Sequence, residues 1–354
     1  PYFVAYEWTR GHYKNDIYGY ASLNYKINDN FELTGRTSVT SYDLFRNEKL
    51  PYSATTYGRE EAKGDYREDK RTLFENNTDI LLKYSKLYNN AFDVKVWAGA
   101  NIRSFSYRSS FVTTDYLNTP GVYTFANSLR PVKAYSFASD MEVQSAYYSA
   151  DLGYKSYINL SATGRVDHLS TLPKGNNTFF YPSFGLSTVI SDYVTLPSAI
   201  SFLKARASYA NVKDGLTRST IGSTPSGSFP VGYGVDYASS YDGPSYANSV
   251  GYTIAPGYNL LPSSSYSDKL DNASLKPNTT EQIEAGLELS FLKNRISGEV
   301  TYFTSNDGPR IFNRDLSQTT GYTNAIVNGI RTQKTGWEVS LKATPVKTQA
   351  FKWD

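Results

Sequence analysis

Asp167 and His168 form the only adjacent carboxylate–histidine pair in the chain and are the first candidates for acid–base chemistry. A histidine beside a carboxylate at the rim of a cleft is a common arrangement for general-base hydrolysis. Successive side chains of a β-strand point to opposite faces, however, so these two residues cannot share a site without a bulge. The other histidine, His12, lies far away in the sequence. We therefore expect no catalytic residues.

A second candidate is the run of acidic and basic residues from 59 to 71, whose carboxylates offer oxygen ligands to a cation. The run lacks the alternating Asp or Asn positions and the turn glycine of a dedicated calcium loop. A solvated loop is the favoured interpretation. The chain has no cysteine, which excludes disulfides, thiolate metal sites and a cysteine nucleophile. We expect neither a metal nor a cofactor.

Aromatic residues are the third group of interest, because exposed rings can stack on the rings of a ligand. The chain contains 32 tyrosines and 4 tryptophans. Candidates for contacts to a ligand or partner lie in a segment rich in Ser, Gly and Tyr: Tyr241, Tyr246, Tyr252 and Tyr258. Trp97 is a further candidate. Packing within a loop or at a membrane interface is the alternative for each ring, and a disordered linker is the alternative for the segment.

The composition favours strands at a membrane–water interface over an ordinary soluble fold. Aromatic residues make up 15% of the chain and charged residues 19%, against roughly 25% charged in typical soluble domains. A net charge of +3 without a Lys/Arg cluster argues against nucleic acid. No stretch approaches the roughly 18 apolar residues of a membrane helix. Strands of a transmembrane barrel escape that test, because lipid-facing and lumen-facing residues alternate along them.

Strict alternation of apolar and polar residues recurs in segments of about ten residues, the length of a tilted membrane-spanning strand. In one of them we expect Val94, Val96, Ala98, Ala100 and Ile102 on the outer wall, with Lys95, Asn101 and Arg103 inside. Eleven strands are predicted, near 15–27, 30–42, 73–86, 91–105, 142–153, 156–168, 179–191, 201–210, 281–291, 295–305 and 334–344, and a twelfth begins near Phe351.

The connections between these strands alternate between short and long. The long ones are predicted near 43–72, 106–141, 211–280 and 306–333, and all should emerge at one end. Short periplasmic turns and long extracellular loops are typical of outer-membrane barrels. We therefore predict an all-β fold, with residues 1–354 forming part of one large antiparallel transmembrane β-barrel. A soluble β-sandwich or propeller is the alternative.

Charged residues on the polar positions of these strands are expected to face the barrel lumen, where water or another part of the protein lets them stay ionised. They are Lys95, Arg103, Arg165, Lys204, Arg206, Glu284, Glu288 and Glu299. Because the strands at 201–210 and 281–291 should be antiparallel neighbours, we expect Lys204 or Arg206 within ion-pair reach of Glu284 or Glu288.

Several motifs in order resemble the SusC/RagA-like family of TonB-dependent outer-membrane transporters. Gly164-Arg165-Val166-Asp167 leads through a short loop to Phe180-Tyr181-Pro182-Ser183, and Leu275-Lys276-Pro277 and Gly336-Trp337-Glu338 follow. The clear matches run from about residue 145 to the end. His168 departs from the family, which usually has Trp there.

The resemblance implies a barrel of about 22 strands filled by an N-terminal plug. This chain would supply 11 or 12 of those strands, and we expect the plug and the last strands to lie outside it. It also implies an outer-membrane importer of oligosaccharides or peptides, driven by the TonB complex through the absent N-terminal region and capped by a SusD-like surface lipoprotein. The alternative is a SusC-like barrel that serves as a non-transporting structural subunit of a larger envelope complex.

Overall fold

The structure is a computed structural model that describes residues 6–53, 60–215, 217–219, 243–245, 252–256, 262–266, 268–347 and 352–353. Strands dominate it, and three short 3-10 helices accompany them, η2 (Phe125–Asn127), η3 (Ile190–Asp192) and η6 (Gln318–Thr320). No helix in these ranges is long and apolar enough to cross a membrane.

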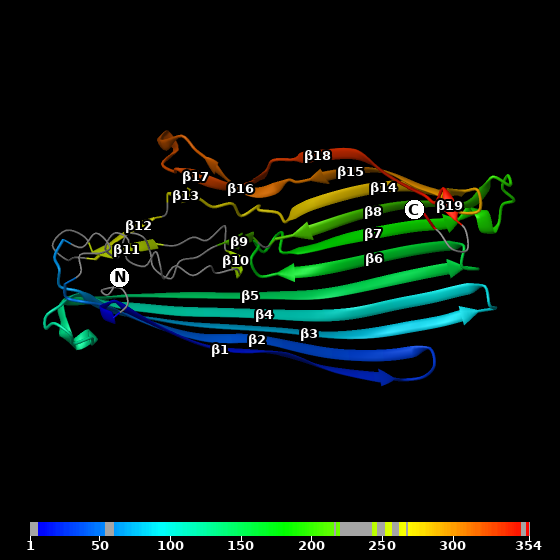
Figure 1. Cartoon of the computed structure of the whole chain (residues 1–354). Coiled ribbons are helices and arrows are strands. Elements are labelled where there is room, and N and C mark those ends of the chain that lie inside the picture. The colour runs from blue at the N-terminus through cyan, green and yellow to red at the C-terminus, as the bar shows by residue number, and fades with distance from the viewer. Residues whose placement is uncertain are drawn as a thin grey trace.

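One eleven-stranded antiparallel sheet forms an open, curved wall (Figure 1). Strands that are neighbours in the sheet follow one another along the chain, apart from the short strands inserted after β8 and after β15. In sheet order the strands are β1 (Thr9–Lys26), β2 (Phe31–Leu50), β3 (Asp65–Tyr88), β4 (Phe92–Leu117), β5 (Ser128–Tyr154), β6 (Ile158–Leu169), β7 (Thr178–Val189), β8 (Ile200–Asp214), β14 (Asn278–Phe291), β15 (Ile296–Asp307) and β18 (Thr332–Ala343). The predicted all-β antiparallel fold is confirmed.

The remaining strands are short and form four small sheets. A three-stranded sheet contains β13 (Lys269–Leu270), β17 (Asn324–Gly329) and β16 (Arg310–Asp315). The three pairs are β9 (Thr217–Ser219) with β10 (Gly243–Ser245), β11 (Tyr252–Pro256) with β12 (Pro262–Tyr266), and β19 (Val346–Lys347) with β20 (Lys352–Trp353). The strand predicted to begin near Phe351 thus corresponds to β20, which pairs with β19 rather than with the large sheet.

Short and long connections separate to opposite ends of the sheet (Figure 1). The tight turns at 27–30, 89–91, 155–157 and 292–295 lie at one end, which we call the turn end. Non-glycine residues with positive φ make several of these turns possible, including Asn89, Asn90 and Lys155. The connections after β2, β4, β6, β8 and β15 leave from the opposite end, which we call the loop end.

Two of the four predicted long loops are largely strand. In the first of them, β2 continues to Leu50 and β3 begins at Asp65. In the second, β4 continues to Leu117 and β5 begins at Ser128. The segment predicted as a loop at 306–333 contains the β16–β17 hairpin. These bounds were missed because both faces of the extended strands carry polar residues, so the alternation of apolar and polar residues disappears while the strand continues.

The register gives the large sheet one apolar and one polar face. Val94, Val96, Ala98, Ala100 and Ile102 share a face with apolar residues of the flanking strands, as in the pairs Leu82–Ala98 and Ala98–Tyr148. Many of these apolar side chains are exposed, for example Ile80 at 52% and Leu160 at 44%. At the turn end the apolar face finishes in contacting aromatic pairs, Phe31–Tyr84, Phe92–Tyr154 and Tyr157–Tyr193. A broad apolar band with an aromatic border is the surface that a lipid bilayer covers.

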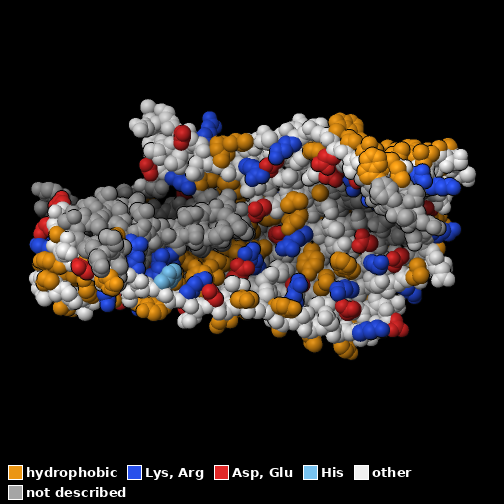
Figure 2. All heavy atoms as spheres, viewed as in Figure 1, with side chains coloured by type: hydrophobic (Ala, Val, Ile, Leu, Met, Phe, Trp, Pro, Cys, Tyr) orange, Lys and Arg blue, Asp and Glu red, His pale blue; other side chains and the backbone are white. Residues whose placement is uncertain are grey.

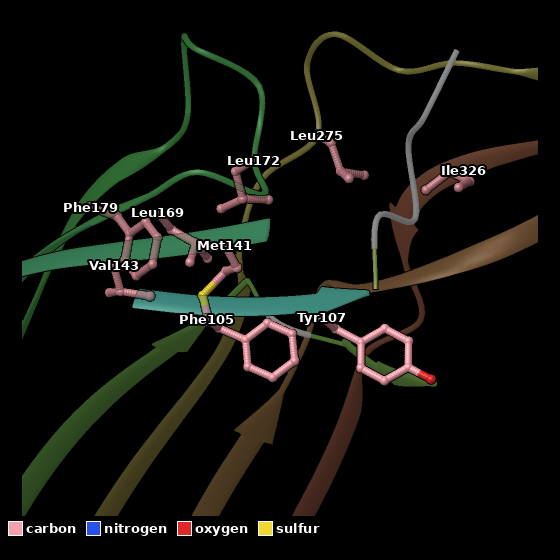
Figure 3. Packing of buried hydrophobic residues seen from close by; sticks show 9 residues of the cluster. All are labelled: Phe105, Tyr107, Met141, Val143, Leu169, Leu172, Phe179, Leu275 and Ile326. Atoms are coloured by element: carbon pink, nitrogen blue, oxygen red, sulfur yellow. The ribbon is translucent and has the colours of Figure 1, made fainter. Parts of the chain in front are cut away.

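The buried core lies on the polar face near the loop end (Figure 3). Six of its residues come from the large sheet: Phe105, Tyr107, Met141, Val143, Leu169 and Phe179. The other three, Leu172, Leu275 and Ile326, come from the connections after β6, before β14 and after β15. Described residues of these three connections therefore pack on the polar face.

Candidate functional site on the polar face

All eight predicted charged residues lie on the polar face. Pairing of adjacent strands fixes this, since residues directly opposite one another in a sheet point to the same side. The registers from β4 to β8 place Lys95, Arg103 and Arg165 on the same face as Lys204 and Arg206. The registers of β8 with β14 and of β14 with β15 add the three glutamates to this face. Charges of both signs are interspersed over the strands in Figure 2.

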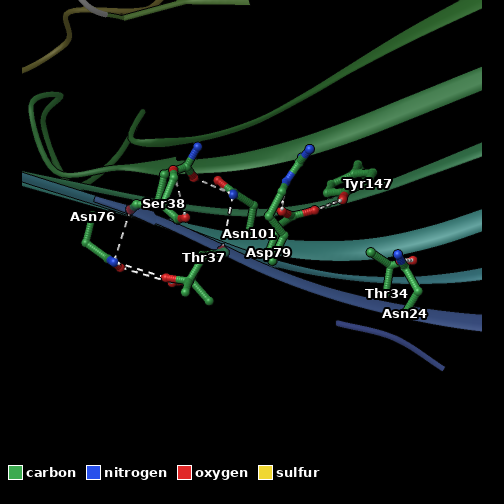
Figure 4. Close-up of polar contacts among 11 residues, drawn as sticks. Asn24, Thr34, Thr37, Ser38, Asn76, Asp79, Asn101 and Tyr147 are labelled. Atoms are coloured by element: carbon green, nitrogen blue, oxygen red, sulfur yellow. Dashed lines mark hydrogen bonds and ion pairs between the residues drawn. The ribbon is translucent and has the colours of Figure 1, made fainter. Parts of the chain in front are cut away.

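The centre of the polar face carries a cluster that spans β2 to β5 (Figure 4). The Arg36 guanidinium lies 3.0 Å from the Asp79 carboxylate, and the Tyr147 hydroxyl donates to the same carboxylate at 3.4 Å. Tyr147 reaches it by lying across Gly99, where an added Cβ would come within 2.6 Å of the ring. A glycine is therefore needed at position 99, because only a residue without a side chain lets Tyr147 of β5 cross β4 at this point.

A second ion pair extends this cluster to β6 and β7. Arg165 donates to Asp167 at 2.7 Å and to the Ser145 hydroxyl at 2.8 Å. The Tyr181 hydroxyl donates to the other oxygen of Asp167 at 2.6 Å. The Arg165 guanidinium also lies 5.9 Å from the centre of the Tyr147 ring, which joins the two halves by a cation–π contact. The result is a continuous polar cluster in which both arginines are paired with aspartates.

Arg103 has its own carboxylate partner nearer the loop end. Two guanidinium nitrogens donate to the two oxygens of Glu75, both at 3.0 Å. This bidentate geometry fixes the side chain more firmly than a single contact does. Beside it, the Asn101 amide donates to Asn77 at 2.6 Å.

The predicted pairing of Lys204 or Arg206 with Glu284 or Glu288 was wrong. Arg206 pairs instead with Glu299 at 2.5 Å and donates to Thr301 at 2.8 Å. The reason is Gly286, which lies directly opposite Arg206 and has no side chain to fill the space. The guanidinium passes over Gly286 to reach the next strand. A Cβ added at Gly286 would lie 2.6 Å from the Arg206 Nε. Lys204 lies opposite Glu288, but among the described residues no ion pair joins them.

Small hydroxyl side chains surround Arg206. Ser161, Ser187 and Ser208 line a hollow of about 210 Å³ together with Gly185, Arg206 and Glu284. Glu284 accepts a hydrogen bond from Gln282 at 2.5 Å, which occupies one of its oxygens. Most of the side chains that line the hollow are polar.

Near the turn end, three lysines of the polar face each pair with a carboxylate. Lys26 contacts Asp29 at 2.8 Å, Lys83 contacts Glu32 at 2.9 Å and Lys95 contacts Asp93 at 2.8 Å. In the turn at 27–30, the hydrogen bond from Lys26 lowers the pKa of the Asp29 carboxyl.

The acidic and basic run near residues 59–71 is not a solvated loop from Asp65 onward. Its alternate members Asp65, Arg67, Asp69 and Arg71 belong to β3 and are at most 1% exposed. Arg71 contacts Asp69 at 2.6 Å, Arg46 contacts the same carboxylate, and Arg67 pairs with the buried Glu48 of β2. Buried charges of this kind persist only when they are paired. They hold the loop ends of β2 and β3 together.

Asp167 and His168 point to opposite faces, as expected for adjacent strand residues. Asp167 belongs to the arginine–tyrosine cluster, whereas the His168 ring contacts the Thr178 hydroxyl at 2.7 Å. Across the described residues, no group of three or more His, Asp or Glu side chains could hold a metal ion. Among the predicted loop contacts, Tyr241, Tyr246 and Tyr258 lie outside the described residues, and Tyr252 begins β11.

Sequence reasoning did not single out Arg36, Glu75, Asp79, Tyr147 and Tyr181. Each occupies a polar position of a predicted strand, so the alternation placed it on the correct face. Its partner, however, depends on which strands are adjacent and in which register, and a single strand pattern does not contain that information.

The fold, the two faces and the segregation of connections define an outer-membrane β-barrel wall. The family model for the TonB dependent receptor-like β-barrel matches residues 1–354, and the chain belongs to this family. Its location is therefore the outer membrane, and its family is one of transporters rather than enzymes.

Sequence relatives agree with this assignment. A TonB-dependent receptor of Formosa agariphila is 26% identical over 319 residues, which are 87% of this chain and 28% of the relative. A second TonB-dependent receptor from the same organism is 24% identical over 365 residues, covering 99% of this chain and 31% of the relative. The chain thus spans about a third of the length of these relatives.

A solved structure shares the fold. The RagAB peptide transporter superposes with a TM-score of 0.77 at 14% identity, over 98% of this chain and 36% of the matched chain. This likeness confirms the predicted SusC/RagA-like barrel architecture.

Proposed function

We propose that this chain forms about half of the barrel wall of a TonB-dependent importer, with the polar face lining the lumen and the loop end outside the cell. The observation that carries the proposal is the separation of side chains by face. Eight charged residues share the face onto which the connections fold, and the opposite face is an exposed apolar band. Lipid tolerates the second surface but not the first.

Cysteine labelling tests which face is wetted. The chain has no cysteine, so introduced thiols are distinguishable within it. Asn101→Cys on the polar face should react with a membrane-impermeant maleimide in the complete receptor, whereas Ala100→Cys next to it should be protected by lipid. Equal labelling of the two variants, or labelling of Ala100→Cys alone, would contradict the assignment of the faces.

The cargo we propose is an oligosaccharide or a peptide, taken up together with a SusD-like surface lipoprotein. The family supports energised uptake, and the RagAB structure is that of a peptide transporter. The wall supports this cargo because it offers ion-paired side chains and hydroxyl groups. These groups can hydrogen-bond to a polar cargo without binding cations or anions preferentially. The lipoprotein would contact the loop end, and the TonB complex would act through a region outside this chain.

Deletion of the gene, with complementation, tests import. Cells that lack the receptor should fail to take up their oligosaccharide or peptide nutrient, and uptake should return with the intact gene but not in a strain without TonB. Co-purification of a surface lipoprotein, lost when the loop-end connections are shortened, would support the partner.

A second function is a barrel retained as a non-transporting subunit of another envelope assembly. The extended, tightly paired strands β2 to β5 favour it, because they form a tall surface beyond the apolar band. Unchanged uptake in the deletion strain, combined with loss of an envelope complex, would favour this function over import.

A further inference from the structure

A hollow of about 410 Å³ opens on the apolar face of the large sheet, where the apolar band ends toward the loop end. It lies over β4, in which Ser104 and Ser106 follow Ile102 on this face. The flanking strands carry large side chains at the same level, with Phe74 of β3 opposite Ser106 and Glu142 of β5 opposite Ser104. The hollow exists because two small serines lie between these larger neighbours.

The hollow faces the surroundings of the barrel and not its lumen. Phe105 and Met141 also border it, but their side chains are buried in the core on the polar face. These two residues therefore reach the hollow only through their backbone. A plug inside the barrel would leave the hollow uncovered.

The level of the hollow is that of the membrane surface. Ile102 lies ten positions beyond Phe92 of the aromatic border at the turn end. Ten residues span about 33 Å along a strand, and a tilt of about 40° reduces this to about 25 Å, the height of the lipid-covered band of a barrel. Ser104 and Ser106, two and four residues further along, therefore lie at the depth of the lipid headgroups.

Acidic groups outnumber basic ones around the hollow. Asp140 pairs with Arg108 at 2.7 Å, whereas Glu142 accepts a hydrogen bond from the neutral Gln144 at 2.6 Å. Among the residues that the structure describes, no basic side chain pairs with Glu142. A cationic group is therefore the favoured ligand. A metal ion is a poor candidate, since the described residues contain no group of three or more His, Asp or Glu side chains that could hold one.

We propose that the hollow binds the headgroup of an outer-leaflet lipid that carries a primary ammonium group, an inference that rests on the lipid exposure of the apolar face proposed above. The ammonium would lie between Glu142 and the Phe74 ring, which is 47% exposed, and would gain an ion pair and a cation–π contact. Two strand spacings, about 10 Å, separate the backbones of β3 and β5 and leave room for it. The Ser104 and Ser106 hydroxyls would donate to the phosphate oxygens. The acyl chains would then lie along Ile102 and the apolar band.

Photo-crosslinking of the complete receptor in lipid nanodiscs tests this proposal. Phe74 is replaced by p-benzoylphenylalanine, which joins on irradiation to a molecule that occupies the hollow. The membrane contains equal amounts of phosphatidylethanolamine, phosphatidylcholine and phosphatidylglycerol, and mass spectrometry of the labelled peptide identifies the adduct. Phe184 is the matched control position, because it is 48% exposed on the same face, opposite Ala162 within the apolar band.

We expect adducts at position 74 to be enriched about fivefold in phosphatidylethanolamine over phosphatidylcholine, whose methylated nitrogen cannot donate a hydrogen bond to Glu142. Adducts at position 184 should follow the composition of the membrane. Glu142→Gln should remove most of the enrichment, since fivefold is the size expected for one hydrogen bond. Glu281→Gln, which changes a glutamate on the same face of β14 outside the hollow, should leave it unchanged.

Equal adducts at positions 74 and 184 would overturn the proposal. Enrichment of phosphatidylglycerol, enrichment that persists in Glu142→Gln, or an adduct with a protein chain at position 74 would also overturn it.

The control position separates this proposal from the proposed function. If position 184 crosslinks to lipid and position 74 does not, the hollow lies beyond the headgroups and only the lipid site is wrong. If neither position crosslinks to lipid, the apolar face does not meet the bilayer and the proposed barrel wall fails as well.

Discussion

Placing a charge at Ala98 tests the depth and the face assigned to the wall. Ala98 lies on the apolar face of β4, six positions from Phe92 in the aromatic border at the turn end. Six residues span about 20 Å along a strand, and a tilt of about 40° reduces this to about 15 Å along the membrane normal. That is close to half of a hydrocarbon core of about 30 Å. Ala98→Arg should therefore sit near the bilayer midplane.

The expected cost of Ala98→Arg is about 2–4 kcal/mol in the free energy of unfolding, the range for a basic residue at this depth on the lipid face. Denaturant unfolding of the complete receptor in lipid vesicles measures it. Asn101→Arg is the matched control, because it introduces the same side chain three residues away on the polar face. A small change for Ala98→Arg, together with a large one for Asn101→Arg, would refute the register.

Three further substitutions test the contacts of the polar face. Gly99→Ala forces the new methyl group against the Tyr147 ring and should lower stability by about 1–3 kcal/mol, measured by thermal unfolding. Asp69→Asn leaves buried guanidiniums without their shared anion and should cost about 3–5 kcal/mol, seen also as faster proteolysis at the loop end. Arg206→Gln breaks a half-exposed pair and should cost less than about 1 kcal/mol, an effect that disappears in high salt.

Matched variants give each result a reference. Gly35→Ala has nothing within 4 Å of the new methyl group and should leave the melting temperature unchanged. Asp93→Asn removes a carboxylate of an exposed pair and should also have little effect. If Asp69→Asn behaved like Asp93→Asn, the buried charges would not hold β2 and β3 together. If Gly35→Ala were as damaging as Gly99→Ala, the Tyr147 contact would not explain the effect.

The sequence predicts the membrane-spanning part of the wall well because lipid imposes a strict rule there. Every second residue from Val94 to Ile102 must be apolar, so the strand and its face can be read from one segment. Beyond the membrane both faces of β3 are polar: Lys70 and Glu68 lie on one face, and Asp69 and Arg67 on the other. The alternation of apolar and polar residues then disappears although the strand continues. Burial of Asp69 and Arg67 depends on residues of other strands, which cannot be identified from the sequence of β3 alone.

Partners of the charged residues were harder to predict than their face. Antiparallel neighbours suggested that Arg206 would meet Glu284 or Glu288, since a cross-strand contact is normally the nearest one. Gly286 changes this by leaving open space opposite Arg206, so the guanidinium reaches one strand further to Glu299. A glycine in a strand thus redirects a long side chain.

Ion pairing along the wall affects the electrostatic interaction between the wall and a molecule beside it. Arg103, Arg165 and Arg206 are neutralised by Glu75, Asp167 and Glu299, each on the same face. A surface lined by one sign of charge would concentrate oppositely charged molecules and also slow their release. These three ion pairs provide hydrogen bonds with little net charge where they lie. On the import function proposed above, these ion-paired stretches of the wall would offer hydrogen bonds to a polar cargo without selecting it by the sign of its charge.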